Sequence, residues 1–207
     1  SAGTAFKAPT FNDLYYPYYG NPDVLPEETQ SYELSARGDY AGGAWRLSAF
    51  RSNVSNLIGY DVSTYSANNI SDATLEGIEV EYSRYFGAWN FSSNLEYLDA
   101  YDDNSGDFLN GRARVSANMQ LGRDFKDVYA GIDVKAEHGR YESAGQRLPG
   151  YGLLGFSLVY QISDNLKLSA RLDNVFDRKY ILNQATSVVY YETEGRTAKV
   201  NLQYQFQ

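Results

Sequence analysis

The chain contains no cysteine and a single histidine among its 207 residues. The lack of cysteine excludes disulfides, thiolate metal sites and thiol chemistry. No run of about 18 apolar residues occurs, which excludes a transmembrane helix. Basic residues are outnumbered, 18 Lys and Arg against 26 Asp and Glu, and the net charge of -8 argues against a nucleic-acid partner. The opening "SAGTAFKAP" lacks the basic and apolar regions of a signal peptide, so the protein is cytoplasmic or its beginning lies outside this sequence.

Tyrosine and glycine are abundant instead. The chain has 20 Tyr and 18 Gly, a composition that favours strands and turns over helices. Apolar and polar residues alternate through most of the sequence, which is the period of a strand with two different faces. The clearest examples are "WNFSSNLEY", "VYAGIDVKAEH", "AKVNLQYQFQ" and "RARVSANMQL", the last of which places Arg114 on the polar face. The alternation predicts roughly ten strands of roughly nine to eleven residues, the length of a tilted strand that crosses a bilayer.

The links between these strands alternate in length. "YAGGA", "YFGA", "GRDFKD" and "QISDN" are short, whereas "DAYDDNSGDFLN", "GRYESAGQRLPG" and residues 183–194 are long and polar. A soluble β-sandwich also alternates apolar and polar faces. Outer-membrane barrels, however, add short turns at one rim, long loops at the other and aromatic girdles, which Trp45, Trp89, Tyr97 and Tyr204 resemble. The predicted fold class is therefore all-β, a transmembrane antiparallel up-and-down β-barrel.

Five stretches resemble TonB-dependent outer-membrane transporters. "LDNVFDRKY" is similar to the family's Asn-Leu-Phe-Asp-x-x-Tyr stretch, and "EGRTAKVNLQYQF" to its closing Gly-Arg and final strand. "FKAPTFNDLYYPYYGNPDVLPEETQSYEL" and "NISDATLEGIEVE" carry further family elements in family order. "WRLSAFRSNVSNLIGYD" is most similar to the cobalamin (vitamin B12) branch. Gln207 departs from the family, whose members usually end on the aromatic residue itself.

The resemblance implies a barrel of twenty-two strands with an N-terminal plug and a TonB box. Residues 1–207 would then be the C-terminal part of the TonB-dependent receptor β-barrel, about ten strands, with the plug domain and N-terminal strands absent. The implied function is TonB-dependent active uptake of cobalamin across the outer membrane of a Gram-negative bacterium. A ferric siderophore or haem receptor and a passive porin-like barrel remain alternatives. The implied partners are cobalamin or a similar large ligand, the remainder of the barrel and plug, TonB and the lipid bilayer.

The stretch "LYYPYYGNP" is the main candidate for contact with a ligand. Each of its tyrosines offers an apolar body and a polar tip, and long loops often carry binding groups. The predicted substrate-binding residues are Tyr15, Tyr16, Tyr18 and Tyr19, with Tyr141 and Arg147 as weaker candidates. Alternatively, the tyrosines pack the loops together or belong to an aromatic girdle.

No stretch predicts catalysis. His138 has Ser143 nearby in sequence but no recognisable hydrolase motif, so a hydrogen-bonded histidine at the rim is the simpler interpretation. The acidic stretch "DAYDDNSGD" is rich in oxygen ligands, which suit calcium, but its spacing matches no EF-hand loop and favours a solvated loop. We therefore expect no enzyme activity, no cofactor and no metal site.

Overall fold

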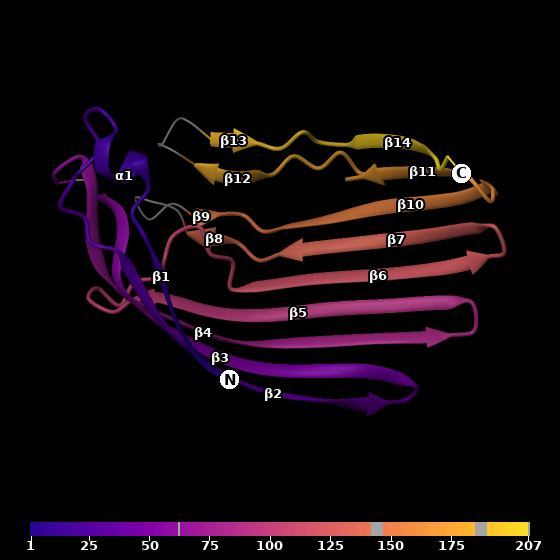
Figure 1. The fold of residues 1–207 in the computed structure, drawn as a ribbon, viewed down its shortest axis with the longest axis horizontal. Coiled ribbons are helices and arrows are strands. Elements are labelled where there is room, and N and C mark those ends of the chain that lie inside the picture. Colours follow the sequence, from indigo (N-terminus) through magenta and orange to yellow (C-terminus); the bar gives the residue numbers. More distant parts are fainter. Residues whose placement is uncertain (62, 142–146, 185–189, 207) are drawn as a thin grey trace. The chain divides into compact units, whose positions relative to one another are not determined.

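The computed structural model describes residues 1–61, 63–141, 147–184 and 190–206. Ser143 and Gln207 lie outside the described residues. Within them the structure consists of strands and one short helix (Figure 1). In chain order the elements are β1 Ala2–Lys7, α1 Phe11–Tyr15, β2 Glu27–Tyr40, β3 Gly43–Asp61, β4 Ser66–Phe86, β5 Trp89–Asp102, β6 Val115–Phe125, β7 Val128–Glu137, β8 Arg140–Tyr141, β9 Arg147–Leu148, β10 Tyr151–Ser163, β11 Leu166–Asp173, β12 Ile181–Gln184, β13 Tyr190–Glu192 and β14 Thr197–Tyr204.

The main sheet follows the order of the chain. Ten strands pair as β1-β2-β3-β4-β5-β6-β7-β10-β11-β14, while β8-β9 and β12-β13 form separate ladders within the long links. The registers of β5–β6, β6–β7, β7–β10, β10–β11 and β11–β14 are all antiparallel. The links at 41–42, 87–88, 126–127 and 164–165 are tight turns. This topology confirms the predicted all-β, antiparallel up-and-down fold. No helix among the described residues is long and apolar enough to span a membrane.

The chain forms two compact units, which share β2 to β5. The first unit comprises residues 1–35, 48–78 and 98–109, and contains β1, α1 and the parts of β2 to β5 that lead into the long links. Its buried side chains are small or polar rather than large and apolar. They are Val24, Ala67, Ala73 and Ala100, together with Glu27, Ser48, Ser71 and Thr74.

The second unit comprises residues 36–47, 79–97 and 110–207, less the undescribed positions. Its strands carry the predicted two faces. On one face Ile132 and Leu202 are 41% and 62% exposed. On the other, Gln120 Nε2 donates to Asp133 Oδ1 at 2.8 Å, and Arg171 Nε donates to Asp173 Oδ1 at 2.7 Å. A soluble sandwich would bury the apolar set, whereas a membrane barrel presents it to lipid.

Two expectations about the strands were wrong. Strands β2 to β5 have 14, 19, 21 and 14 residues rather than nine to eleven, because polar stretches next to the long links continue the pairing. Strand β6 begins only at Val115, and the preceding Arg114 donates from Nη2 to the hydroxyl of Tyr97 at 2.8 Å. Since Tyr97 belongs to the apolar face, Arg114 does not line the polar face as its alternation predicted.

Candidate functional site

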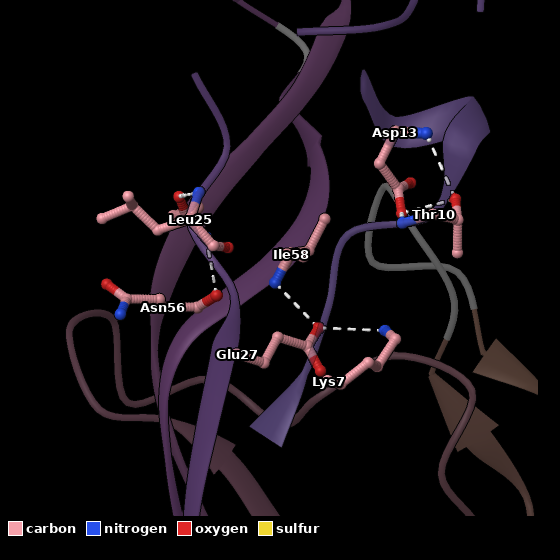
Figure 2. A network of polar contacts seen from close by, with 8 residues as sticks. Lys7, Thr10, Asp13, Leu25, Glu27, Asn56 and Ile58 are labelled. Carbon is pink, nitrogen blue, oxygen red and sulfur yellow. Dashed lines mark hydrogen bonds and ion pairs between the residues drawn. The ribbon is translucent and has the colours of Figure 1, made fainter. Parts of the chain in front are cut away.

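The link between β1 and β2, residues 8–26, carries the predicted tyrosines, and it begins with helix α1. Thr10 caps this helix, and the Asp13 backbone N–H donates to Thr10 Oγ1 at 3.2 Å. In return, the Thr10 backbone N–H and hydroxyl donate to Asp13 Oδ2 at 2.8 and 2.7 Å (Figure 2). This capping box satisfies backbone donors that a helix of one turn leaves unpaired. The hydrogen bond from the Thr10 side chain also lowers the pKa of Asp13 below its usual value.

After the helix the chain folds back upon it. The Tyr16 carbonyl accepts from the backbone N–H groups of Tyr19 and Gly20, at 3.1 and 2.7 Å. A Cβ on Gly20 would lie 2.5 Å from the Tyr15 nitrogen and 2.6 Å from the Tyr16 nitrogen, so only glycine fits this close approach. Tyr18 has a left-handed backbone, with φ of 65°, which is uncommon for a residue other than glycine. Backbone hydrogen bonds and the close approach of Gly20 therefore fix the turn at residues 16–20, in which Tyr18 is fully exposed.

Asparagine side chains on β4 hold the second half of this link. Asn69 Oδ1 accepts from the Leu25 backbone N–H at 2.8 Å, and Asn69 Nδ2 donates to the carbonyls of Leu25 and Asn56 at 3.0 and 2.7 Å. Asn68 adds a bond between Asn21 Nδ2 and its own Oδ1, at 2.7 Å. Figure 2 shows Leu25 and Asn56, which are thus bridged by one amide. The link is tied to β3 and β4 through polar contacts.

The buried carboxylate of Glu27 lies at the end of the same link. Glu27, the first residue of β2, is only 8% exposed. Its Oε1 accepts from Lys7 Nζ at 3.1 Å and from the Ile58 backbone N–H at 3.0 Å (Figure 2). A buried charge is tolerated where it is paired and hydrogen-bonded. Glu27 therefore joins β1, β2 and β3 at the point where the tyrosine-bearing link leaves the sheet.

The four predicted tyrosines of this link differ in exposure. Tyr15 and Tyr16 are 58% and 56% exposed, and Tyr18 is fully exposed. Tyr19 is half-buried, and its ring stacks on that of Tyr60 with centroids 6.1 Å apart. Burial and the nearby charge of Asp13 raise the pKa of Tyr19. Three tyrosines thus offer free aromatic surface, while Tyr19 packs the link against β3.

The weaker candidates lie in the second unit, in the link between β7 and β10. Tyr141 on β8 pairs directly with Arg147 on β9, so the structure brings these two residues together. Arg147 Nη2 lies 3.5 Å from His138 Nε2, and His138 Nδ1 lies 3.0 Å from the Gly139 carbonyl. His138 is therefore a hydrogen-bonded rim residue, as expected. Among the residues that the structure describes in this link, Tyr141 and Arg147 offer a side-chain surface for contact.

The acidic stretch in the first unit is organised by its own backbone. Asp102 Oδ1 accepts from the backbone N–H groups of Asn104 and Ser105, at 2.8 and 2.9 Å. Asp103 Oδ2 accepts from the Thr74 hydroxyl at 3.2 Å. Among the described residues no group of three or more His, Cys, Asp or Glu is arranged to hold a metal ion. The carboxylates of Asp102 and Asp103 therefore act as hydrogen-bond acceptors that stabilise the local turn.

Sequence reasoning missed the residues that fix the tyrosines in place. Asn69 and Tyr60 lie in the stretches "NISDATLEGIEVE" and "WRLSAFRSNVSNLIGYD". The resemblance of these stretches did not predict that Asn68, Asn69 and Tyr60 each contact a residue more than forty positions away. Glu27 follows Pro26 in a family element, but nothing in the sequence predicted its burial. The adjacent pair of asparagines in a strand was a further local signal, because asparagine is depleted in strands.

Comparison with known sequences identifies the family. Residues 1–175 match the family described as TonB dependent receptor-like, beta-barrel. The chain is 32% identical, over its whole length, to the vitamin B12 transporter BtuB of Vibrio vulnificus. It is 31% identical to the vitamin B12 transporter BtuB of Photobacterium profundum, with 93% of the chain covered. The chain spans 34% of the length of each of these relatives.

Solved structures agree on the fold. The copper transporter OprC matches 99% of the chain with a TM-score of 0.84 at 21% identity, and the match covers 36% of that protein. A mutant ferric enterobactin receptor of Pseudomonas aeruginosa matches 99% of the chain with a TM-score of 0.80 at 23% identity, covering 37% of that protein. Members of this family are transporters of the Gram-negative outer membrane rather than enzymes. The chain belongs to the TonB-dependent receptor β-barrel family.

Proposed function

We propose that the protein imports cobalamin across the outer membrane in a TonB-dependent manner. The observation that carries this proposal is the 32% identity to a curated vitamin B12 transporter along the whole chain. The structural neighbours that have copper or ferric siderophores in their names are 16% to 23% identical to this chain. Identity in this range supports a shared fold but is too low to support a shared ligand.

The tyrosine-bearing link suits such a ligand. Residues 8–26 contain no lysine or arginine, whereas they contain Asp13, Asp23 and the exposed rings of Tyr15, Tyr16 and Tyr18. Ferric siderophores of the catecholate class are strongly anionic and would favour basic contacts. A large, amide-rich and nearly neutral ligand instead favours rigid amphipathic rings that lose little side-chain entropy on binding. Tyr15, Tyr16 and Tyr18 are therefore the proposed contacts, with Tyr141 and Arg147 as secondary ones.

The second unit serves as barrel wall in this proposal. Its polar face bounds a concave space of about 1320 Å³ lined by residues such as Glu81, Asn118, Asp133, Lys135 and Arg171. In a complete receptor this face would line the lumen and meet the plug. Residues 1–207 would thus be the C-terminal part of the wall of a larger barrel, which does no chemistry and transports nothing by itself. Residues 1–207 expressed alone should give neither cobalamin uptake nor a heat-modifiable barrel on electrophoresis.

A cobalamin isotherm on the full-length protein tests the ligand. Saturable binding is expected, and Tyr18→Ala should weaken it about tenfold, equivalent to about 1.4 kcal/mol. Tyr85→Ala is the matched control, because Tyr85 is 80% exposed but lies next to the short turn at 87–88. Saturable binding of a ferric siderophore or haem with no cobalamin isotherm would replace the proposed ligand. Growth rescue that does not need TonB would favour a passive porin-like barrel instead.

A further inference from the structure

A cluster of arginines and aromatic rings lies on the apolar face of the second unit, at the end where its strands meet the short turns. Arg123, near the end of β6, has its guanidinium carbon 5.0 Å from the ring centroid of Trp89 and 4.6 Å from that of Phe125. The Trp89 ring stacks on Phe86, and the guanidinium carbon of Arg84 lies 5.7 Å from the Phe86 ring. These five residues are called the arginine–aromatic cluster below.

The register shows that the cluster faces the apolar side. Arg123 pairs across the sheet with Trp89 and Ala130, and Ala130 pairs with Leu158. The same row continues through Ala170 to Val200. Every other member of this row is apolar, and the other side of the sheet carries the polar residues. Arg123 is therefore a cation on the surface that, in this family, meets the bilayer.

The guanidinium groups of this cluster have no acceptor within the described part of the chain. The Nε atoms of Arg84 and Arg123 are both buried without a hydrogen-bond partner there. Arg171 on the polar face is different, because its Nε is bonded to Asp173 and its Nη1 lies 3.8 Å from Asp133. A cation without a carboxylate in a partly apolar setting calls for an anion supplied from outside the chain.

An apolar depression starts beside Arg123. It has a volume of about 540 Å³ and is lined by Trp89, Phe125, Ile132, Phe156 and Leu158, among others. Ala130, Ala170 and Ala198 form part of its floor, and their small side chains leave room between the larger ones. A depression with a cation at its rim has the shape and chemistry of an amphiphile site, with an anionic head at the arginine and a chain along the alanines.

We propose that the arginine–aromatic cluster binds the headgroup of an anionic glycerophospholipid, whose acyl chain lies in the alanine-floored depression. The short turns of outer-membrane barrels lie on the periplasmic side, so the lipid belongs to the periplasmic leaflet. Arginine binds phosphodiester oxygens through its fork of donors, and aromatic rings sit at the level of headgroups. The neighbouring outward positions Val128, Tyr160 and Leu168 carry no acid to pair with an ammonium headgroup, and Asp127 in the adjacent turn is already paired with Lys126 Nζ at 3.6 Å. An uncharged glycerol headgroup is therefore preferred over ethanolamine.

Lipid quenching tests this inference in the full-length protein. The protein is reconstituted in phosphatidylcholine nanodiscs that contain a small fraction of brominated phosphatidylglycerol or, separately, brominated phosphatidylethanolamine. Tryptophan quenching measures enrichment of each lipid at the cluster, and Trp89→Phe identifies the signal of that ring. About fivefold enrichment of phosphatidylglycerol over phosphatidylethanolamine is expected, because one arginine attracts an anionic lipid to about that extent. Arg123→Gln should reduce the preference, because only Arg84 then remains in the cluster, and Arg123→Lys should reduce it less.

Lys167→Gln is the matched control, since it removes one cation from the polar position next to the outward-facing Leu168. It should leave the preference unchanged. Heat-modifiable mobility verifies that each variant is folded. Equal quenching by both lipids in the wild type, or an undiminished preference in a folded Arg123→Gln variant, would overturn the proposal. Inorganic phosphate added in excess should not displace the lipid, and displacement would show that the site recognises phosphate alone. Cobalamin binding is not part of the readout, so this test is independent of the proposed ligand.

Discussion

The first and second units differ in what holds their strands together. In the first unit, polar side chains join distant segments, as the half-buried amide of Asn69 and the buried carboxylate of Glu27 do for the tyrosine-bearing link. In the second unit, rows of apolar side chains run across β6, β7, β10, β11 and β14 on one face and remain exposed. No side chain of bulky apolar type is fully buried among the described residues.

The difference reflects the surroundings of each unit. A sheet in lipid needs no closed core, because the bilayer covers its apolar face and the ladder satisfies its backbone. A loop structure in water cannot rely on lipid, so polar side chains must fix it. A charge placed on the apolar face should therefore destabilise the second unit. Loss of a polar tether should instead destabilise the first unit.

The largest effect is expected for Ile132→Arg in the middle of the apolar face of β7. A cation at the centre of the lipid-facing band of a barrel costs about 2–4 kcal/mol. Gln120→Arg is the control, because Gln120 occupies the polar face and donates to Asp133. Unfolding by urea from lipid bilayers measures both changes. If the two variants lose equal stability, the assignment of the two faces is wrong.

Gly20→Ala should have the next largest effect, and it should be confined to the first unit. The new methyl group would press against backbone nitrogens at 2.5 and 2.6 Å, and overpacking of this kind costs about 1–3 kcal/mol. Residues 8–26 should lose hydrogen-exchange protection while β6 and β7 keep theirs. Gly3→Ala, where a Cβ has nothing within 4 Å, should leave both regions unchanged. Unaltered hydrogen-exchange protection in the Gly20 variant would contradict the close approach of Gly20 to the backbone of Tyr15 and Tyr16.

Asn69→Ala tests the polar tether with a somewhat smaller expected cost. The substitution leaves the Leu25 N–H and the carbonyls of Leu25 and Asn56 without their partner, at about 1–2 kcal/mol. Faster proteolysis within residues 8–26 and weaker ligand binding should follow together. Asn201→Ala on the exposed polar face of β14 is the control. A tether role would be excluded if the two variants were equally resistant to protease.

The smallest effect concerns pH and Asp13. The pKa of Asp13 is lowered in the folded link, chiefly by the Thr10 side chain, so its contribution to stability is present above the usual carboxyl pKa and is lost as the pH falls. Because Asp13 is only partly buried, solvent screens its interactions and the effect should stay below about 1 kcal/mol. Protection of residues 8–26, corrected for intrinsic exchange, should decline between about pH 5 and pH 3. Asp13→Asn should flatten this pH dependence. An equally steep decline in that variant would show that Asp13 is not its source.

The second unit was largely predictable from the sequence. Alternation in stretches such as "VYAGIDVKAEH" is local, and it identified both faces and the strand order because neighbouring strands of an up-and-down sheet are consecutive in the chain. It failed at Arg114, where the pattern persists before pairing begins at Val115. Periodicity shows which way a residue would point in a strand but not where the strand starts.

The first unit was less predictable. The tyrosines were identified from composition, but the burial of Tyr19 against Tyr60 and the bridging role of Asn69 depend on contacts between distant segments. The lengths of β3 and β4 were underestimated for a related reason. Bilayer thickness sets the length of the spanning part only, and these strands continue for 19 and 21 residues.

Uptake of labelled cobalamin tests the functional account most directly. The full-length protein is expressed in Gram-negative cells that lack their own cobalamin transporter, with and without TonB. The account predicts saturable uptake that requires TonB and that falls in the Tyr18→Ala variant but not in Tyr85→Ala. Uptake that persists without TonB, or a folded protein at the cell surface that takes up no cobalamin, would contradict it.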